Sequence, residues 1–251
     1  MRSAVLMLIA CGCVVIGEPA RGQTPAAEKV VYSANFDGYE ETGNWGGADG
    51  WKVVSRSPSD FKAAIGNAYG KTGKGLLVQN TKSQDSGGSF RVSRRLDEAA
   101  GNAHFTVAFD YFVPTTGNPE VSSRLDVYLE DVDGVGAPPF QLGLETSRGV
   151  FTSKVTSKGD EAAGVRPTKE YASFKVARDQ WHTLRIEVDQ DKGRFRLRLD
   201  DTPVSAGGEE WFAFQTDRPL AVAKSKILSF TASTASPSST RHIDNLIVSV
   251  P

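Results

Sequence analysis

The feature that most constrains the fold is a repeated alternation of apolar and polar residues over short segments. In the segment 123–131, Leu125, Val127 and Leu129 point one way, whereas Arg124 and Tyr128 point the other. The segment 103–113 alternates in the same manner. An alternation with a period of two places one face of a strand in a core and the other in solvent. The sequence therefore predicts strands with one buried face each.

A hairpin is predicted over 181–201, where two alternating segments are joined by Asp191-Lys192-Gly193. The glycine supplies the positive φ that tight turns need. Further strands are expected at 30–36, 75–79, 89–96, 140–145, 150–156, 172–176, 227–232 and 243–250, with short helices near 96–100 and 209–214. This set predicts an all-β fold, in which two antiparallel sheets pack as a sandwich.

The first residues indicate export. Arg2 precedes an apolar run over 4–16, which has the length of a signal peptide and is too short for a membrane span. We predict a signal peptide over 1–22, a flexible linker over 23–29 and one domain over 30–251. Cys11 and Cys13 both lie in the signal peptide, so no disulfide is expected in the mature chain. The segment 8–11 is similar to a lipoprotein acylation box, and lipid anchoring stays open as an alternative to a secreted or periplasmic form.

The charge balance excludes some partners. The chain has 29 basic and 30 acidic residues, a formal net charge of −1. Such a balance gives no electrostatic basis for binding nucleic acid or an anionic membrane. A monomer is expected.

Several landmarks together resemble the concanavalin A-like lectin and glucanase superfamily, which includes laminin-G-like modules. They are the opening 33–39, the pair Gly50-Trp51, the long strand 105–113, the segment 181–188 running into 196–201, and the closing 242–248. The resemblance covers nearly the whole mature chain and implies a jelly-roll sandwich. It further implies that a polysaccharide or oligosaccharide lies across a concave sheet.

The sequence lacks the catalytic motifs that enzymes of this fold carry. Retaining glucanases need two carboxyl groups about 5 Å apart. The nearest candidates, Asp126 and Glu130, are separated by roughly 13 Å of strand. Continuous lyase motifs are absent, and the ending of 3-keto-glycoside hydrolase-like proteins is missing too. We therefore predict glycan binding without catalysis, with a lyase, a 3-keto-glycoside hydrolase-like enzyme or a structural surface protein as alternatives.

Candidate ligand-binding residues follow from residue type and face. Aromatic rings stack on sugars, and neighbouring polar side chains bind hydroxyl groups. The polar row on the 123–131 strand is the best candidate. Further candidates lie in a Gly-rich loop and on the polar faces of other strands. The predicted set is Arg124, Asp126, Tyr128, Glu130, His104, Gln141 and Trp45. Trp51, Trp181 and Trp211 are assigned to packing, because Trp51 begins a strand and each of the other two adjoins an apolar run.

Two further features of the sequence are a candidate calcium site and a row of charged residues. Proteins of this fold often hold a structural calcium where the first and last strands meet, and the resemblance assigns Asp37 and Asp244 to that place. The row Arg194, Arg196 and Arg198 faces Arg185, Glu187 and Asp189 across the hairpin. Mixed charges of this kind favour cross-strand ion pairs on a solvated face, with an acidic polysaccharide as the alternative partner.

Overall fold

The computed structural model describes residues 28–55, 61–80, 89–114, 123–130, 140–147, 150–156, 168–175, 177–205, 207–213, 227–233 and 240–251. The predicted signal peptide and the linker up to residue 27 lie outside these ranges. Strand β1 begins at Lys29, one residue before the predicted domain start. No helix within the described ranges is long and apolar enough to cross a membrane.

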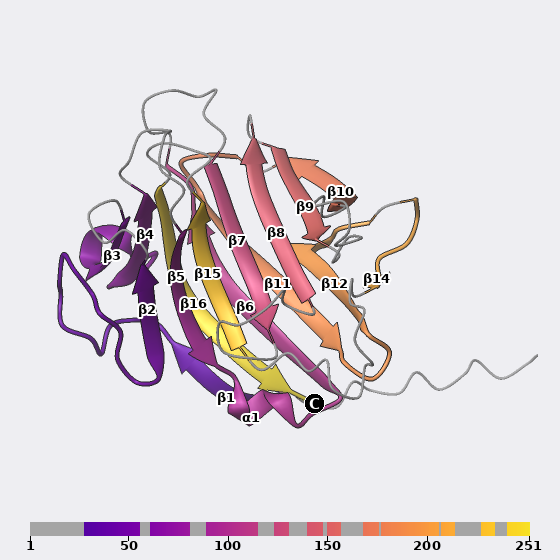
Figure 1. Ribbon diagram of the computed structural model, residues 1–251, viewed down its shortest axis with the longest axis horizontal. Coiled ribbons are helices and arrows are strands. Elements are labelled where there is room, and N and C mark those ends of the chain that lie inside the picture. The colour runs from indigo at the N-terminus through magenta and orange to yellow at the C-terminus, as the bar shows by residue number, and fades with distance from the viewer. Residues whose placement is uncertain are drawn as a thin grey trace, which may run out of the picture.

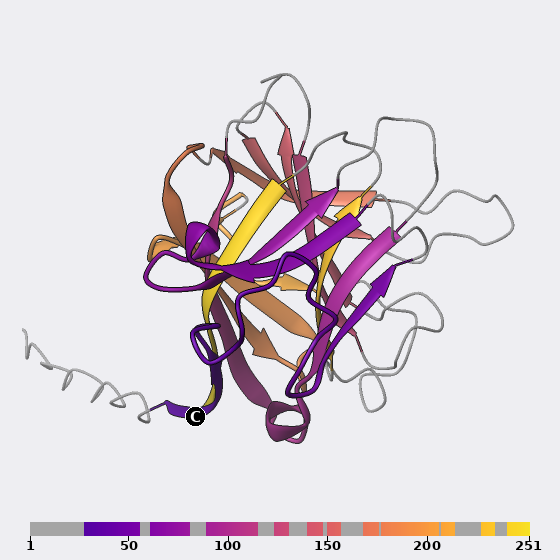
Figure 2. The same ribbon diagram turned by 90° about the vertical axis from the view of Figure 1, so that its left-hand side faces the viewer.

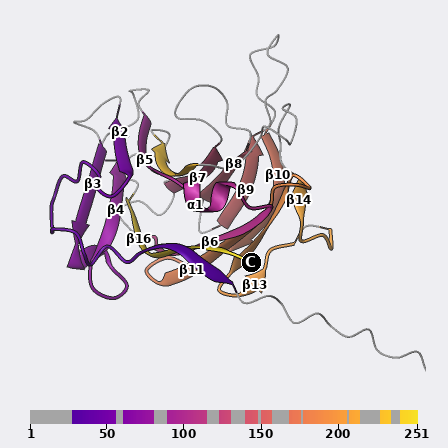
Figure 3. The same ribbon diagram turned by 90° about the horizontal axis from the view of Figure 1, so that it is seen from below.

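Two antiparallel sheets form the molecule, and Figure 3 shows them as two layers seen from below. Sheet A contains nine strands within the described ranges, with β13-β12-β11-β6-β16-β4-β3 as its main path. Strand β1 pairs with β16, and β14 pairs with β12. The bounds are β1 Lys29–Ala34, β3 Phe61–Gly66, β4 Gly75–Asn80, β6 His104–Phe112, β11 Trp181–Asp189, β12 Arg194–Leu199, β13 Thr202–Pro203, β14 Phe212–Ala213 and β16 Thr240–Val250.

Sheet B has the order β10-β9-β8-β7-β15-β5-β2 and lies in front in Figure 1. Its strands are β2 Trp51–Ser55, β5 Ser89–Arg95, β7 Ser123–Glu130, β8 Phe140–Ser147, β9 Val150–Thr156, β10 Thr168–Lys175 and β15 Ile227–Ser233. The short 3-10 helix η1 Asn67–Tyr69 precedes β4, and α1 Asp97–Ala100 follows β5. Figure 2 shows that β1 begins beside the end of β16, close to the C-terminus.

The core lies between the sheets and contains apolar side chains of the strands whose side chains the structure describes. On β11, Leu184, Ile186 and Val188 are buried, whereas the residues between them are half-buried on the outer side. Phe109 of β6 packs edge-on against Phe230 of β15, with 5.1 Å between ring centroids. This contact joins the two sheets directly. The alternation that predicted the sandwich thus corresponds to the division between core and surface.

The predicted strands are present, with ends that differ by a few residues. The helix predicted near 96–100 is α1, and Gly193 has the expected positive φ of 59° in the hairpin turn. The helix predicted over 209–214 is wrong. Phe212 instead begins the two-residue strand β14, because its ring packs against Phe195 of β12 at 5.6 Å.

Candidate functional site

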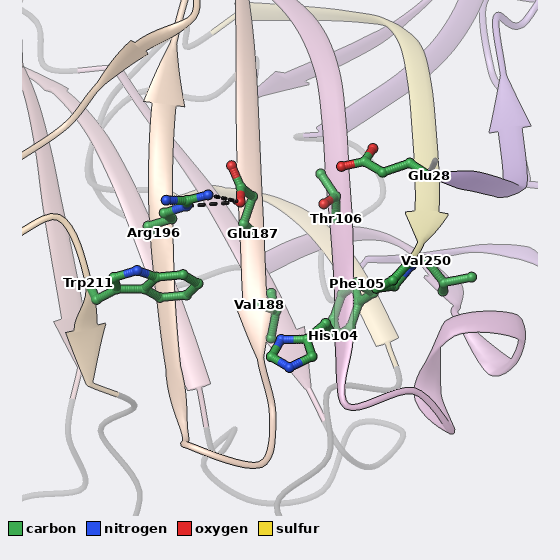
Figure 4. Close-up of a pocket in the computed structure, with 10 residues that line it drawn as sticks. Glu28, His104, Phe105, Thr106, Glu187, Val188, Arg196, Trp211 and Val250 are labelled. Carbon is green, nitrogen blue, oxygen red and sulfur yellow. Dashed lines mark hydrogen bonds and ion pairs between the residues drawn. The ribbon is translucent and has the colours of Figure 1, made fainter. Parts of the chain in front are cut away.

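A pocket of about 310 Å³ opens on the outer face of sheet A, and we call it the Trp211 pocket. Figure 4 shows its lining side chains, which come from β6, β11, β12, the segment directly before β14 and both ends of the described chain. Its polar and aromatic members are Glu28, His104, Phe105, Thr106, Glu187, Arg196 and Trp211. Because the inner sides of these strands are buried in the core, their outer sides hold the polar residues of the alternation.

Charged side chains pair across the β11–β12 hairpin. Its register sets Glu187 opposite Arg196 and Asp189 opposite Arg194. The Arg196 guanidinium donates two hydrogen bonds to Glu187 Oε2, at 2.6 and 2.8 Å. Arg198 and Arg185 approach Glu187 Oε1, with their Nε atoms at 3.4 and 3.6 Å. The cross-strand ion pairs predicted from the sequence are therefore confirmed.

Asp189 anchors the bottom of the hairpin. Its side chain is only 1% exposed, and its Oδ2 atom lies 3.1 Å from Arg194 Nε. Burial alone would raise the pKa of Asp189, but hydrogen bonds from the Lys192 backbone N–H and from Arg194 together hold this pKa below its ordinary value. The carboxylate therefore keeps its negative charge and fixes Arg194 against the sheet.

Trp211 borders the pocket with its indole ring. The guanidinium carbons of Arg194 and Arg196 lie 4.4 and 5.0 Å from the ring centroid, within the range of cation–π contacts. Since both guanidinium groups are themselves held by carboxylates, the ring has a fixed orientation. Sequence reasoning assigned Trp211 to packing but did not indicate its contacts with these two arginines. The signal available in the sequence was the row of three arginines on β12. Strand β14, which begins directly after Trp211, pairs with β12.

Of the two predicted ligand-binding residues whose side chains the structure describes, His104 and Trp45, His104 lines this pocket. Its side chain is 54% exposed, and its Nδ1 atom lies 3.9 Å from Asp189 Oδ1. The sequence grouped His104 with the row on 123–131, but β6 belongs to sheet A and β7 to sheet B. His104 and the row on 123–131 therefore belong to different sheets.

Five other predicted residues fall on β7 and β8 of sheet B. The backbone register brings Tyr128 opposite Gln141 on neighbouring strands. The side chains of Arg124, Asp126, Tyr128, Glu130 and Gln141 lie outside the part of the molecule that the structure describes. A binding face on these strands stays a prediction.

Trp45 lies in the core rather than on an open loop. It is 6% exposed and packs against Tyr39, Trp51 and Phe36, with ring centroids 5.5 to 6.4 Å away. A sugar ring needs an open aromatic face for stacking, and this burial leaves Trp45 none. Trp51, which the sequence assigned to the core, is 4% exposed there.

The residues predicted to bind calcium, Asp37 and Asp244, both accept hydrogen bonds from the backbone of the loop 71–74. Asp37 Oδ1 accepts a hydrogen bond from Lys74 N at 2.7 Å, and Asp37 Oδ2 accepts one from Asn35. Asp244 Oδ2 accepts hydrogen bonds from the backbone N–H groups of Lys71 and Thr72, at 2.8 and 3.3 Å.

This geometry does not fit a divalent cation. Asp244 Oδ1 is also occupied, by the backbone N–H of Asn245 at 2.8 Å, so every oxygen of the two carboxylates already accepts a hydrogen bond. Burial, reinforced by nearby Asp110, raises the pKa of Asp244 despite these hydrogen bonds. Within the described ranges, no three histidine, cysteine or acidic residues gather in a way that would hold a metal ion.

Comparison with known proteins gives the fold a name. No family model and no curated sequence matches the chain. Among solved structures, a carbohydrate esterase of Shiga toxin-encoding bacteriophage phi24B is similar over 89% of this chain and 99% of its own, with 14% identity and a TM-score of 0.60. The endo-β-1,3(4)-glucanase SCLam of family GH16 matches over 90% of this chain and 92% of its own, with 11% identity and a TM-score of 0.55.

A structure from a study of endo-acting O-glycanases of the human gut microbiota has the same TM-score of 0.55, at 14% identity. It covers 90% of this chain and 92% of its own. At such identities the likeness concerns the arrangement of strands alone. The chain has the concanavalin A-like jelly-roll fold, as the resemblance in its sequence predicted.

Proposed function

We propose that this protein is an exported glycan-binding protein and that its ligand occupies the Trp211 pocket. The observation that carries the proposal is the indole of Trp211, which two ion-paired arginines hold beside a pocket lined by both apolar and polar side chains. An aromatic face stacks on the C–H face of a pyranose, and adjacent carboxylate, guanidinium and imidazole groups bind its hydroxyl groups. The fold supports the proposal, because carbohydrate-active proteins are among those that share it.

The size and charge of the pocket indicate the kind of ligand. A volume of about 310 Å³ is at the small end of the range for ligand pockets. It suits one or two sugar units, with the rest of a longer chain extending over the sheet. The two carboxylates that line the pocket, those of Glu28 and Glu187, are each paired with a guanidinium group, so neither sign of charge dominates. We therefore favour a neutral glycan over an acidic polysaccharide.

The partners of the carboxylates favour binding over hydrolysis. A retaining glycosidase needs one carboxylate free to attack and a second one to donate a proton. Both oxygens of Glu187 face guanidinium groups, and the carboxylate of Glu28 bonds Arg185 and Ser249. Among the described pocket residues, no pair of carboxyl groups is free for this chemistry.

The test is a glycan array probed with the full chain, followed by titration of the best glycan. We expect measurable binding and no new reducing or unsaturated ends. Trp211→Ala should weaken binding about thirtyfold, since stacking and its buried area contribute about 2 kcal/mol. Trp181→Ala is the matched control, because Trp181 lies at the far end of β11 and should leave affinity unchanged.

Three results would contradict the proposal in different ways. Binding to no glycan would remove the function itself. If Trp211→Ala and the unchanged protein bind with equal affinity, the ligand does not occupy the Trp211 pocket. If Tyr128→Ala then loses that binding, the ligand binds on sheet B instead. Release of unsaturated or reducing products would show one of the enzymatic alternatives.

A further inference from the structure

The loop Lys71–Lys74 lies where the chain's first and last strands meet. It follows η1, leads into β4 and is held by Asp37 after β1 and by Asp244 within β16. A β-bulge in β16 shifts the pairing with β6 between Asp244 and Ile247. Asn245 there has a φ of 49°. Bulges of this kind turn a side chain to a new direction, and here the Asp244 carboxylate meets the loop backbone.

The ammonium group of Lys74 binds the backbone of the segment that follows β1. Its Nζ atom donates hydrogen bonds to the carbonyl oxygens of Tyr39 at 2.6 Å and Asp37 at 3.1 Å. The backbone N–H of the same residue donates to Asp37 Oδ1. One lysine thus contacts the two carbonyls and the carboxylate that a bound cation would take as oxygen ligands at this place.

We propose that Lys74 is a built-in cation that takes the place of calcium at this junction. The domain is therefore joined here without metal. The proposal is independent of the glycan-binding function, because the Lys74 loop contributes no residue to the Trp211 pocket.

The chemistry of the two cations supports this assignment. Calcium requires six to eight oxygen ligands at about 2.3–2.6 Å. An ammonium group has three donors and is satisfied by two or three carbonyl oxygens at ordinary hydrogen-bond distances. Its positive charge on the carbonyls of Asp37 and Tyr39 repels a second cation from the same oxygens.

Gly73 shows how closely the loop approaches Asp37. It has a φ of 75°, and a Cβ atom at this position would lie 2.1 Å from Asp37 Oδ1. A side chain at residue 73 would therefore push the carboxylate away from the loop. The glycine lets the backbone N–H and the ammonium of Lys74 bind the same turn.

The first experiment measures thermal unfolding of the full chain with excess calcium and with EDTA. A site that binds calcium would raise Tm by mass action. Because Lys74 takes the place of calcium, we expect the two Tm values to agree within about 1 °C. Lys74→Met should lower Tm by about 4 °C in both buffers. Lys71→Met is the control from the same loop. Its ammonium pairs with Asp110 at 3.1 Å and is 41% exposed, so a loss of about 1 °C is expected.

The second experiment works on the unchanged protein and needs no folded variant. Reductive methylation followed by mass spectrometry should modify Lys74 about tenfold more slowly than Lys71, because its ammonium must first leave two carbonyls. A Tm that rises with calcium and falls with EDTA would overturn the proposal. Equal methylation rates, or equal losses of Tm in the two methionine variants, would also overturn it.

Discussion

The outer face of sheet A has two ends with different chemistry, and strand β6 connects them. His104 at the start of β6 lies in the Trp211 pocket, among ion pairs. Phe112 at its other end, roughly 27 Å away by strand rise, lies between His242 of β16 and Trp181 of β11. With Tyr69 of η1, these three residues form what we call the aromatic row.

The rings of the aromatic row contact one another closely. Phe112 and His242 are stacked with 5.4 Å between centroids, and Trp181 lies 5.5 Å from Phe112. Tyr69 covers the other side of His242 at 5.3 Å. The same alternation of a strand thus produces an open, charged surface at one end and a half-buried aromatic surface at the other. We infer that the first end serves ligand binding and the second serves stability.

The largest effect that distinguishes the two ends should come from pH. Burial, with a smaller contribution from Arg241, lowers the pKa of His242 from 6.5 to about 4. Between these values the unfolded chain binds a proton that the folded chain does not. Acidification from pH 6.5 to pH 4 should therefore lower the free energy of unfolding by about 3 kcal/mol through His242.

Urea unfolding at several pH values checks this expectation. In His242→Phe, which keeps a ring in the row, this part of the pH dependence should be lost. Trp211→Ala is the control from the pocket end, because it removes no titratable group, and its pH dependence should follow that of the unchanged protein. If His242→Phe also retains the full dependence, the acid sensitivity arises elsewhere.

Sequence reasoning predicted the strands well where one face is buried and the other is not. It missed β3, whose residues from Ala63 to Gly66 are all buried, so that no alternation is visible there. For the site, Trp45 was predicted to bind ligand from a loop but is buried in the core, whereas Trp211, assigned to packing, lies against two arginines at the edge of the pocket. A ring beside apolar residues and a ring in a glycine-rich loop give no local sign of burial, because the fold of the loop decides it.

The two tryptophans at opposite ends of the face should also differ in their contribution to stability. Trp181→Ala removes the outer ring of the aromatic row and should lower the free energy of unfolding by about 2 kcal/mol, less than for a fully buried ring. Trp211→Ala should cost less than about 1 kcal/mol, since its partners are surface guanidinium groups. Chemical denaturation of both variants measures the difference. Equal losses would mean that the pocket end is structural as well.

The smallest effect should come from Glu187, which organises the pocket end. Glu187→Gln leaves the guanidinium groups of Arg196 and Arg198 beside each other without a carboxylate, at a side chain that is 19% exposed. We expect a loss of about 1 kcal/mol in unfolding free energy, which should shrink at high salt as repulsion is screened.

Asp97→Asn is the matched control for this substitution. It breaks an exposed pair with Arg95, in which the two side chains are 62% and 48% exposed, and should cost less than about 0.5 kcal/mol. Because Arg196 also lies over the indole of Trp211, Glu187→Gln should loosen the ring and weaken glycan binding about threefold. A variant that loses stability and keeps full affinity would show that the ion pairs support the sheet alone. A parallel loss of both would show that the same charges that pair the strands also orient the ring for its ligand.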